Sequence, residues 1–197
     1  MDEPHKASPS NRPNHLKRHR HLLPVTACLL VFIATVAVLQ MMQADYDARN
    51  QFISELALGR CGEWLRVAFA TLAVALSIIA NGLRCAKAPK WLTALPFAAA
   101  ISFLAAGEIT LSASADTHIT LVAIAFVCCA TAMYTLSRST SILSGRFTRT
   151  ISWSCTVILC GAIGLGSHCL DVGLAQRVAA SALFCWLCLI AWRLDTT

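Results

Sequence analysis

The side chains of this chain that could do chemistry lie in short polar segments between long apolar stretches. Carboxylates, histidines, arginines and one serine recur there, and chain counting places most of them at one level of a helical bundle. The candidate site residues are Ser54, Glu55, Arg60, Glu63, Arg66, Glu108, Asp116, His118, His168, Asp171 and Arg177. Ionisable residues in or beside apolar membrane stretches are uncommon and point to function, so we interpret this set as one polar cluster.

Three of these residues are of the types that bind zinc. Asp116, His118 and His168 offer a carboxylate oxygen and imidazole nitrogens, which are common zinc ligands. A zinc-bound water, or the hydroxyl of Ser54, could then hydrolyse an ester or an amide. The chain has neither a His-Glu-x-x-His nor a Gly-x-Ser-x-Gly motif, so catalysis has no motif of its own here.

The same residues also have structural interpretations. Asp116 could cap the helix that follows it, because its carboxylate accepts backbone N–H groups. His168 could be satisfied by a backbone carbonyl. An unpaired charge in such surroundings is costly, so we expect Glu108 to lie near Arg66, another basic group or a histidine. Both interpretations stay open at this stage.

Six apolar stretches must position the cluster. The chain is 57% hydrophobic and 13% charged, whereas a soluble domain is about 25% charged. Each stretch approaches the roughly 20 residues that a helix needs to cross a bilayer. The predicted spans are residues 22–42, 64–83, 91–111, 119–136, 151–167 and 178–192. The sequence therefore predicts an all-α bundle of six transmembrane helices.

The domain organisation is simple. Residues 1–20 are polar, basic and contain proline, which predicts a disordered tail, while residues 21–194 form one transmembrane domain. The net charge of +6 is typical of cytoplasmic loops in a membrane protein. We therefore expect membrane lipids as partners, and no nucleic acid.

Charge placement predicts the orientation. With the N-terminus in the cytoplasm, twelve of the 16 Lys and Arg residues lie on the inner side, as the positive-inside rule requires. Both termini are therefore expected in the cytoplasm, with the chain in the inner membrane of a prokaryote. The polar cluster then lies at the outer face.

Two pairs among the ten cysteines have the position or the spacing that redox chemistry needs. Cys61 and Cys169 both lie at the predicted outer boundary, where a disulfide could persist. Cys185 and Cys188 have the Cys-x-x-Cys spacing, but they lie inside a span without a βαβ pattern. We interpret the second pair as packing residues.

Glycines are concentrated in the fifth span. Gly161, Gly164 and Gly166 form a Gly-x-x-Gly-x-Gly pattern inside the membrane, where no strand precedes it as in a nucleotide-binding loop. Small residues let membrane helices approach closely, and we predict close packing there.

Three segments carry a resemblance to a known family. Ser54-Glu-Leu-Ala-Leu-Gly-Arg60, followed by Glu63-Trp64, resembles the signature of the domain of unknown function 998 family. Asp116-Thr-His118 and Gly173-Leu-Ala-Gln-Arg177 resemble two further elements of that family. The resemblance extends over Leu22 to Trp192 and implies a six-span prokaryotic membrane protein. It implies no activity.

Three functions follow as hypotheses. The first is a membrane protein whose polar cluster binds a small ligand or a lipid headgroup. The second is a metal-dependent lipid hydrolase of the outer leaflet, with zinc as its cofactor. The third is a small proton-coupled transporter in which Glu108 titrates, although the middles of the spans lack the polar residues and repeats typical of transporters.

Overall fold

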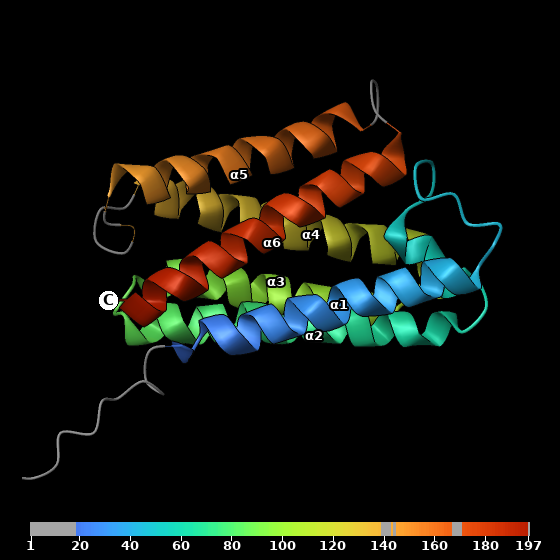
Figure 1. Cartoon of the computed structure of the whole chain (residues 1–197), viewed down its shortest axis with the longest axis horizontal. Helices are drawn as coiled ribbons and strands as arrows, with labels where there is room; N and C mark the ends of the chain where they lie inside the picture. The colour runs from blue at the N-terminus through green and yellow to red at the C-terminus, as the bar shows by residue number, and fades with distance from the viewer. Residues whose placement is uncertain (1–18, 139–142, 144, 167–170, 197) are drawn as a thin grey trace, which may run out of the picture.

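The computed structural model is a bundle of six long helices that run side by side (Figure 1). The structure describes residues 19–138, 143, 145–166 and 171–196. Each of the six helices is long and apolar enough to cross a membrane. No strand occurs among the described residues, and the prediction of an all-α, six-span membrane protein is confirmed.

The elements follow one another in simple order. The long helices are α1 (Leu22–Met42), α2 (Leu65–Cys85), α3 (Lys90–Glu108), α4 (Leu111–Arg138), α5 (Arg146–Leu165) and α6 (Val172–Thr196). Loop 1, residues 43–64, connects α1 to α2 and contains the short 3-10 helices η2 (Ile53–Leu58) and η3 (Gly62–Trp64). We call the end of the bundle that carries loop 1 the loop-1 end, and the opposite end the termini end (Figure 1).

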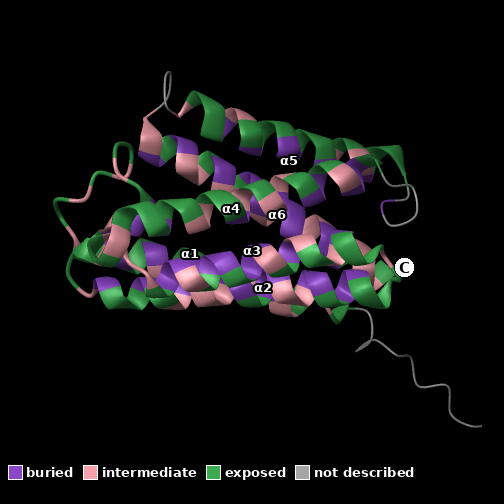
Figure 2. Ribbon diagram, turned by 180° about the vertical axis from the view of Figure 1, so that it is seen from behind, coloured by how far each residue is buried: buried purple, intermediate pink, exposed green. Residues whose placement is uncertain are grey.

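The core lies along α2, which packs against α1, α3 and α6. Leu72, Leu76, Ile79 and Leu83 are almost fully buried, and their three- and four-residue spacing places them on one helix face. Large apolar side chains such as Leu30 and Val127 are exposed on the outside. Figure 2 shows this distribution, with buried residues between the helices and exposed ones on the outer faces. An apolar exterior suits a helix bundle whose surroundings are hydrocarbon.

A buried hydroxyl ties α4, α5 and α6 together towards the termini end. The Ser152 hydroxyl donates to the backbone oxygen of Met133 at 3.1 Å and accepts from Trp186 Nε1 at 3.1 Å. Ser152 and Trp186 are fully buried. Because every group of this network has a partner, it stabilises the contact of the three helices.

The last turn of α6 holds the first turn of α1 at the termini end. The Asp195 carboxylate accepts from the backbone N–H groups of His21 and Leu22, both at 2.9 Å, and contacts His21 Nδ1 at 2.8 Å. The Asp195 side chain is 2% exposed. It satisfies two of the N–H groups that a helix N-terminus leaves without partners.

The boundaries around the start of α4 correct the prediction. The third helix ends at Glu108, and α4 begins at Leu111 instead of residue 119. Ser114 has extended backbone inside α4, with φ −163° and ψ 100°, so a short first turn precedes the long helix. Hydropathy marks only the part of a helix inside hydrocarbon, which explains why this polar turn, and the polar ends of α5 and α6, lay outside the predicted spans.

The predicted close packing of the α5 glycines is wrong at two of the three positions. Among the described residues, a Cβ atom built on Gly161 or Gly164 would meet no atom within 4 Å. Only Gly166 approaches a neighbour closely, since its Cβ would lie 2.7 Å from the Ala175 Cβ. The part of α5 around Gly161 and Gly164 therefore has open space beside it.

Candidate functional site

Loop 1 folds over the beginning of α6. The backbone N–H of Leu174 donates to the Arg49 carbonyl oxygen at 3.0 Å. Gly173 allows this approach, because a Cβ there would lie 2.6 Å from the Ala48 oxygen and 2.8 Å from the Arg49 oxygen, and closer still to that of Gln51. Only a residue without a side chain fits against three carbonyl groups at this distance.

Arg177 fixes the same loop through its guanidinium. Arg177 Nη2 donates to the Tyr46 hydroxyl at 2.7 Å, and Nη1 donates to the Gly173 oxygen at 2.9 Å and to the Gln51 oxygen at 3.3 Å. The Tyr46 hydroxyl in turn donates to the Phe52 oxygen at 3.0 Å. Burial raises the pKa of the Tyr46 phenol, and the hydrogen bond from Arg177 opposes that rise. The charge of Arg177 is thus used to hold loop 1.

Glu55 also serves loop 1. Its Oε1 accepts from the Phe52 backbone N–H at 2.8 Å, and its Oε2 accepts from Gln51 Nε2 at 3.2 Å. This is the arrangement of a capping-box carboxylate at the start of a helix. Gln43 Nε2 donates to the carbonyl oxygens of Leu56 and Arg60, at 3.0 and 3.1 Å. We call these contacts, which Gly173, Arg177, Glu55 and Gln43 make with the backbone and side chains of loop 1, the loop-1 lock.

The remaining charged members of the cluster face outward. Arg66 Nη1 lies 3.9 Å from Glu108 Oε2, and both side chains are more than half exposed. The prediction that Glu108 lies within ion-pair distance of Arg66 is confirmed. Asp171 pairs with Arg49 at 3.3 Å. The side chains of Arg60 and Glu63 are exposed. Exposed pairs of this kind contribute little to stability.

Asp116 does not cap a helix. It is exposed and lies inside α4, two residues after Ser114, whose extended backbone precedes the long part of the helix. The Ser114 hydroxyl donates to Thr117 Oγ1 at 2.8 Å. Of the two interpretations of Asp116, the one that made it the N-cap is therefore not the one seen in the structure. Its carboxylate lies in the first turn of the long part, where the helix dipole favours a negative charge.

His118 differs from the charged members of the cluster that the structure describes. It is 3% exposed, and its Nδ1 lies 2.9 Å from the Ala106 oxygen and 2.8 Å from the Ile109 oxygen. Its ring stands edge-on to Phe69, with 5.8 Å between the ring centroids. Its Nε2 is buried and has no hydrogen-bond partner among the described residues. A buried polar atom without a partner is costly, which makes His118 a candidate for ligand contact.

His118 lines a cavity between α4, α5 and α6. The cavity has a volume of about 620 Å³, within the range of small-molecule sites. Residues of α4, α5 and α6 form its walls, among them Val122, Phe126 and Ile163. Several wall residues are also exposed on the outside, including Ile119, Val127 and Ile163. The cavity thus lies beside the lipid-facing surface.

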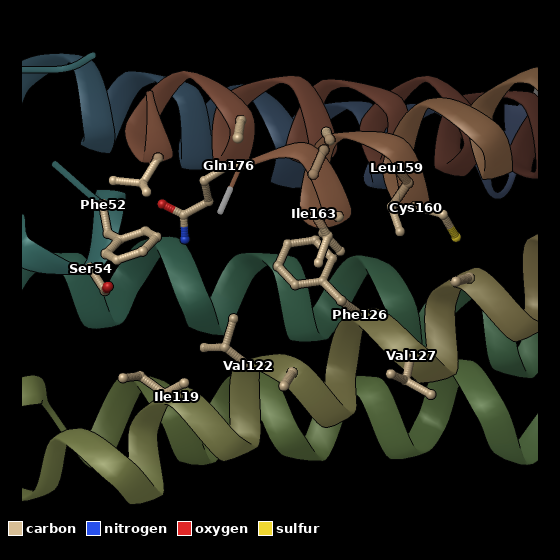
Figure 3. A pocket seen from close by; sticks show the side chains of 18 of the residues that line it. Phe52, Ser54, Ile119, Val122, Phe126, Val127, Leu159, Cys160, Ile163 and Gln176 are labelled. Atoms are coloured by element: carbon tan, nitrogen blue, oxygen red, sulfur yellow. The ribbon is translucent and has the colours of Figure 1, made fainter. Parts of the chain in front are cut away.

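The polar groups of the cavity lie at one end. Figure 3 shows Phe52, Ser54 and Gln176 at that end and only apolar or sulfur-containing side chains at the other. Ser54 is 6% exposed. Gln176 Oε1 accepts from the Ile53 backbone N–H at 2.7 Å, which fixes the orientation of the amide. Its Nε2 points into the cavity (Figure 3). The cavity is therefore polar at one end and apolar along the rest of its length.

The zinc hypothesis stays a prediction. His168 lies outside the described residues, as does Cys169 of the predicted disulfide with Cys61. Among the residues that the structure describes, no three His, Cys, Asp or Glu side chains lie close enough to hold a metal ion. Asp116 is exposed and His118 is buried.

Several residues of this region were not among the candidate site residues predicted from the sequence. Tyr46 and Gln43 hold loop 1, and Gln176 reaches the cavity. Gln176 lies in the Gly173–Arg177 element that carried the resemblance, so that element contained a signal for it. Phe52 and the apolar cavity walls carried none, because they look like ordinary membrane-facing residues.

Comparison with known proteins identifies the chain at the level of its family. No curated protein and no solved structure matches it. The family described as "Protein of unknown function (DUF998)" matches residues 26–193. This range includes all three segments of the resemblance. The segments Ser54–Arg60 and Gly173–Arg177 contribute residues to the loop-1 lock. The chain is a multi-pass membrane protein with six apolar helices, and it belongs to the DUF998 family.

Proposed function

We propose that the protein binds a membrane amphiphile, with the apolar chain of the ligand in the cavity between α4, α5 and α6. The observation that carries the proposal is the cavity itself, about 620 Å³ in volume and almost entirely apolar in its lining. Its few polar groups lie at the loop-1 end (Figure 3). Apolar pockets with a small number of polar groups are typical ligand sites.

The position of the cavity favours a ligand that comes from the membrane. Its walls include exposed residues of α4 and α5, so a lipid chain reaches it sideways. The glycines of α5 support this, because Gly164 and Gly166 line the cavity and add no side chain to fill it. A lipid bound in this way has its polar part near Ser54 and Gln176.

Photolabelling tests the proposal. The purified protein in lipid nanodiscs is exposed to a fatty-acyl lipid with a photoreactive group on its chain, and the labelled peptides are identified by mass spectrometry. We expect labelling to concentrate on the cavity-lining segments of α4 and α5. An excess of the same lipid without the photoreactive group should compete. Equal labelling of all lipid-facing helices would contradict the proposal.

A matched pair of variants sharpens this experiment. Ala123 lines the cavity and is exposed, so Ala123→Trp should fill part of the space and reduce the labelling. Ala37 is an exposed alanine of α1 that is not among the lining residues. Ala37→Trp adds the same side chain and should leave the labelling unchanged.

Hydrolysis of a lipid ester is the second candidate function. It is favoured by Ser54 and His118, a nucleophile type and a base type, lining the same cavity. Fatty-acid release from a monoacylglycerol by the purified protein, lost in Ser54→Ala, would support it. No release above that of protein-free vesicles would remove it.

We further propose that both termini face the cytoplasm of a prokaryotic cell and that loop 1 faces outward. The distribution of Lys and Arg supports this orientation. The cavity then opens to the outer leaflet. Reporter fusions at the C-terminus should report the cytoplasm, and reporters inserted in loop 1 should report the outside. The opposite pattern would reverse the assignment of leaflets.

A further inference from the structure

The hydrogen-bonding state of His118 indicates which amphiphile fits. Both contacts of Nδ1 are with backbone carbonyl oxygens, of Ala106 and Ile109. A carbonyl oxygen only accepts, so Nδ1 must carry the hydrogen. A neutral imidazole has one N–H, and in His118 it is the one on Nδ1. Nε2 is therefore a hydrogen-bond acceptor.

This acceptor is without a donor among the described residues. Nδ1 is held by the carbonyl oxygens of Ala106 and Ile109, at the end of α3. The two ring nitrogens point in widely different directions, so Nε2 points away from these two oxygens. His118 is among the residues that line the cavity, together with Ser54 and Gln176. A ligand group that reaches Nε2 must donate a hydrogen bond.

Gln176 adds the complementary requirement. Its Oε1 is occupied by the Ile53 N–H, and its Nε2 points into the cavity as a donor (Figure 3). The polar end of the cavity thus offers one fixed acceptor and one fixed donor, beside the Ser54 hydroxyl, which can donate or accept. No Lys, Arg, Asp or Glu is among the described residues that line the cavity, so none of these lining residues would serve as counter-ion to a charged headgroup.

We infer that the cavity selects an uncharged lipid with a free hydroxyl group, of the class of monoacyl- and diacylglycerols. The hydroxyl donates to His118 Nε2, and an ester or second hydroxyl oxygen accepts from Gln176 Nε2. This inference rests on the proposed function, that the cavity binds an amphiphile. It adds the chemistry of the headgroup.

A pair of competitors tests it in the unmodified protein. Photolabelling of the cavity is competed either by a long-chain monoacylglycerol or by the same lipid with both hydroxyls converted to methyl ethers. The ether keeps the chain and the acceptor oxygens but has no donor. We expect the hydroxyl lipid to compete about tenfold better, because a buried acceptor left unpaired costs about that factor or more. A fatty acid, ionised at neutral pH, should compete no better than the ether.

The variant His118→Phe provides the second arm. It should bind the ether as the unmodified protein does and should bind the hydroxyl lipid no more than about twofold better than the ether. Equal competition by both lipids in the unmodified protein would overturn the inference and leave the proposed function standing. Failure of both lipids to compete where the parent lipid without the photoreactive group does compete would also overturn the inference, whereas failure of all three would overturn the proposed function itself. A full hydroxyl preference in His118→Phe would also overturn the role of Nε2.

Discussion

Two polar regions lie side by side at the loop-1 end, and they differ in how completely their groups are paired. In the loop-1 lock, Arg177 makes three hydrogen bonds and Glu55 uses both carboxylate oxygens. In the cavity, His118 has a buried nitrogen without a partner among the described residues. A satisfied network stabilises a fold, whereas an unsatisfied group at a cavity leaves a bond for a ligand to make. The comparison separates scaffold from site within one cluster.

The largest effect is expected from Gly173→Ala, which attacks the lock where it is tightest. The new Cβ would collide with carbonyl oxygens of Ala48, Arg49 and Gln51, and the loop must move away from α6. We expect a loss of about 3 kcal/mol in the free energy of unfolding, measured as a lower unfolding temperature in detergent. Gly161→Ala is the control, because its Cβ meets no atom within 4 Å. Equal effects would mean that loop 1 is not held by this contact.

A smaller loss is expected from Arg177→Met, which keeps the length of the side chain but removes its donors. The Tyr46 hydroxyl and the oxygens of Gly173 and Gln51 then lose a charged partner, at a cost of about 2 kcal/mol. Proteolysis of loop 1 should accelerate in parallel. Arg60→Met is the matched control, since Arg60 is exposed and only its backbone oxygen takes part in the lock.

A third change, His118→Phe, tests the cavity, which is the second of the two regions compared. It removes two hydrogen bonds of Nδ1 but also removes the unpaired Nε2, and the two effects oppose each other. We expect the unfolding free energy to fall by about 1 kcal/mol, less than in Arg177→Met, when both are measured without added lipid. A loss larger than that of Arg177→Met would make His118 part of the scaffold.

The smallest effect is expected from Arg66→Gln. Arg66 and Glu108 are 3.9 Å apart and more than half exposed, so the pair contributes about 0–1 kcal/mol. Unfolding temperatures of Arg66→Gln and of the unmodified protein should agree within the error of the measurement. A clear loss would show that the outward-facing part of the cluster also supports the fold.

The sequence allowed the spans to be predicted because hydrocarbon imposes a simple length and composition on them. The proximity of Glu108 to Arg66 was predicted on the ground that a buried charge needs a partner, but both side chains are more than half exposed. The cavity was not predicted, since it depends on where α5 has space beside Gly164, and a glycine pattern alone suggests the opposite. The break at Ser114 was also missed, because the turn before it is polar and has no apolar face.

The carboxylate of Asp195 has a consequence for how the protein is made. It belongs to the last turn of the last helix, yet it satisfies the first N–H groups of α1. During synthesis, which proceeds from the N-terminus, the amino end of α1 lacks these two bonds until Asp195 has been made. Closure of the bundle at this end therefore comes late, after the five long helices that precede α6 have been synthesised.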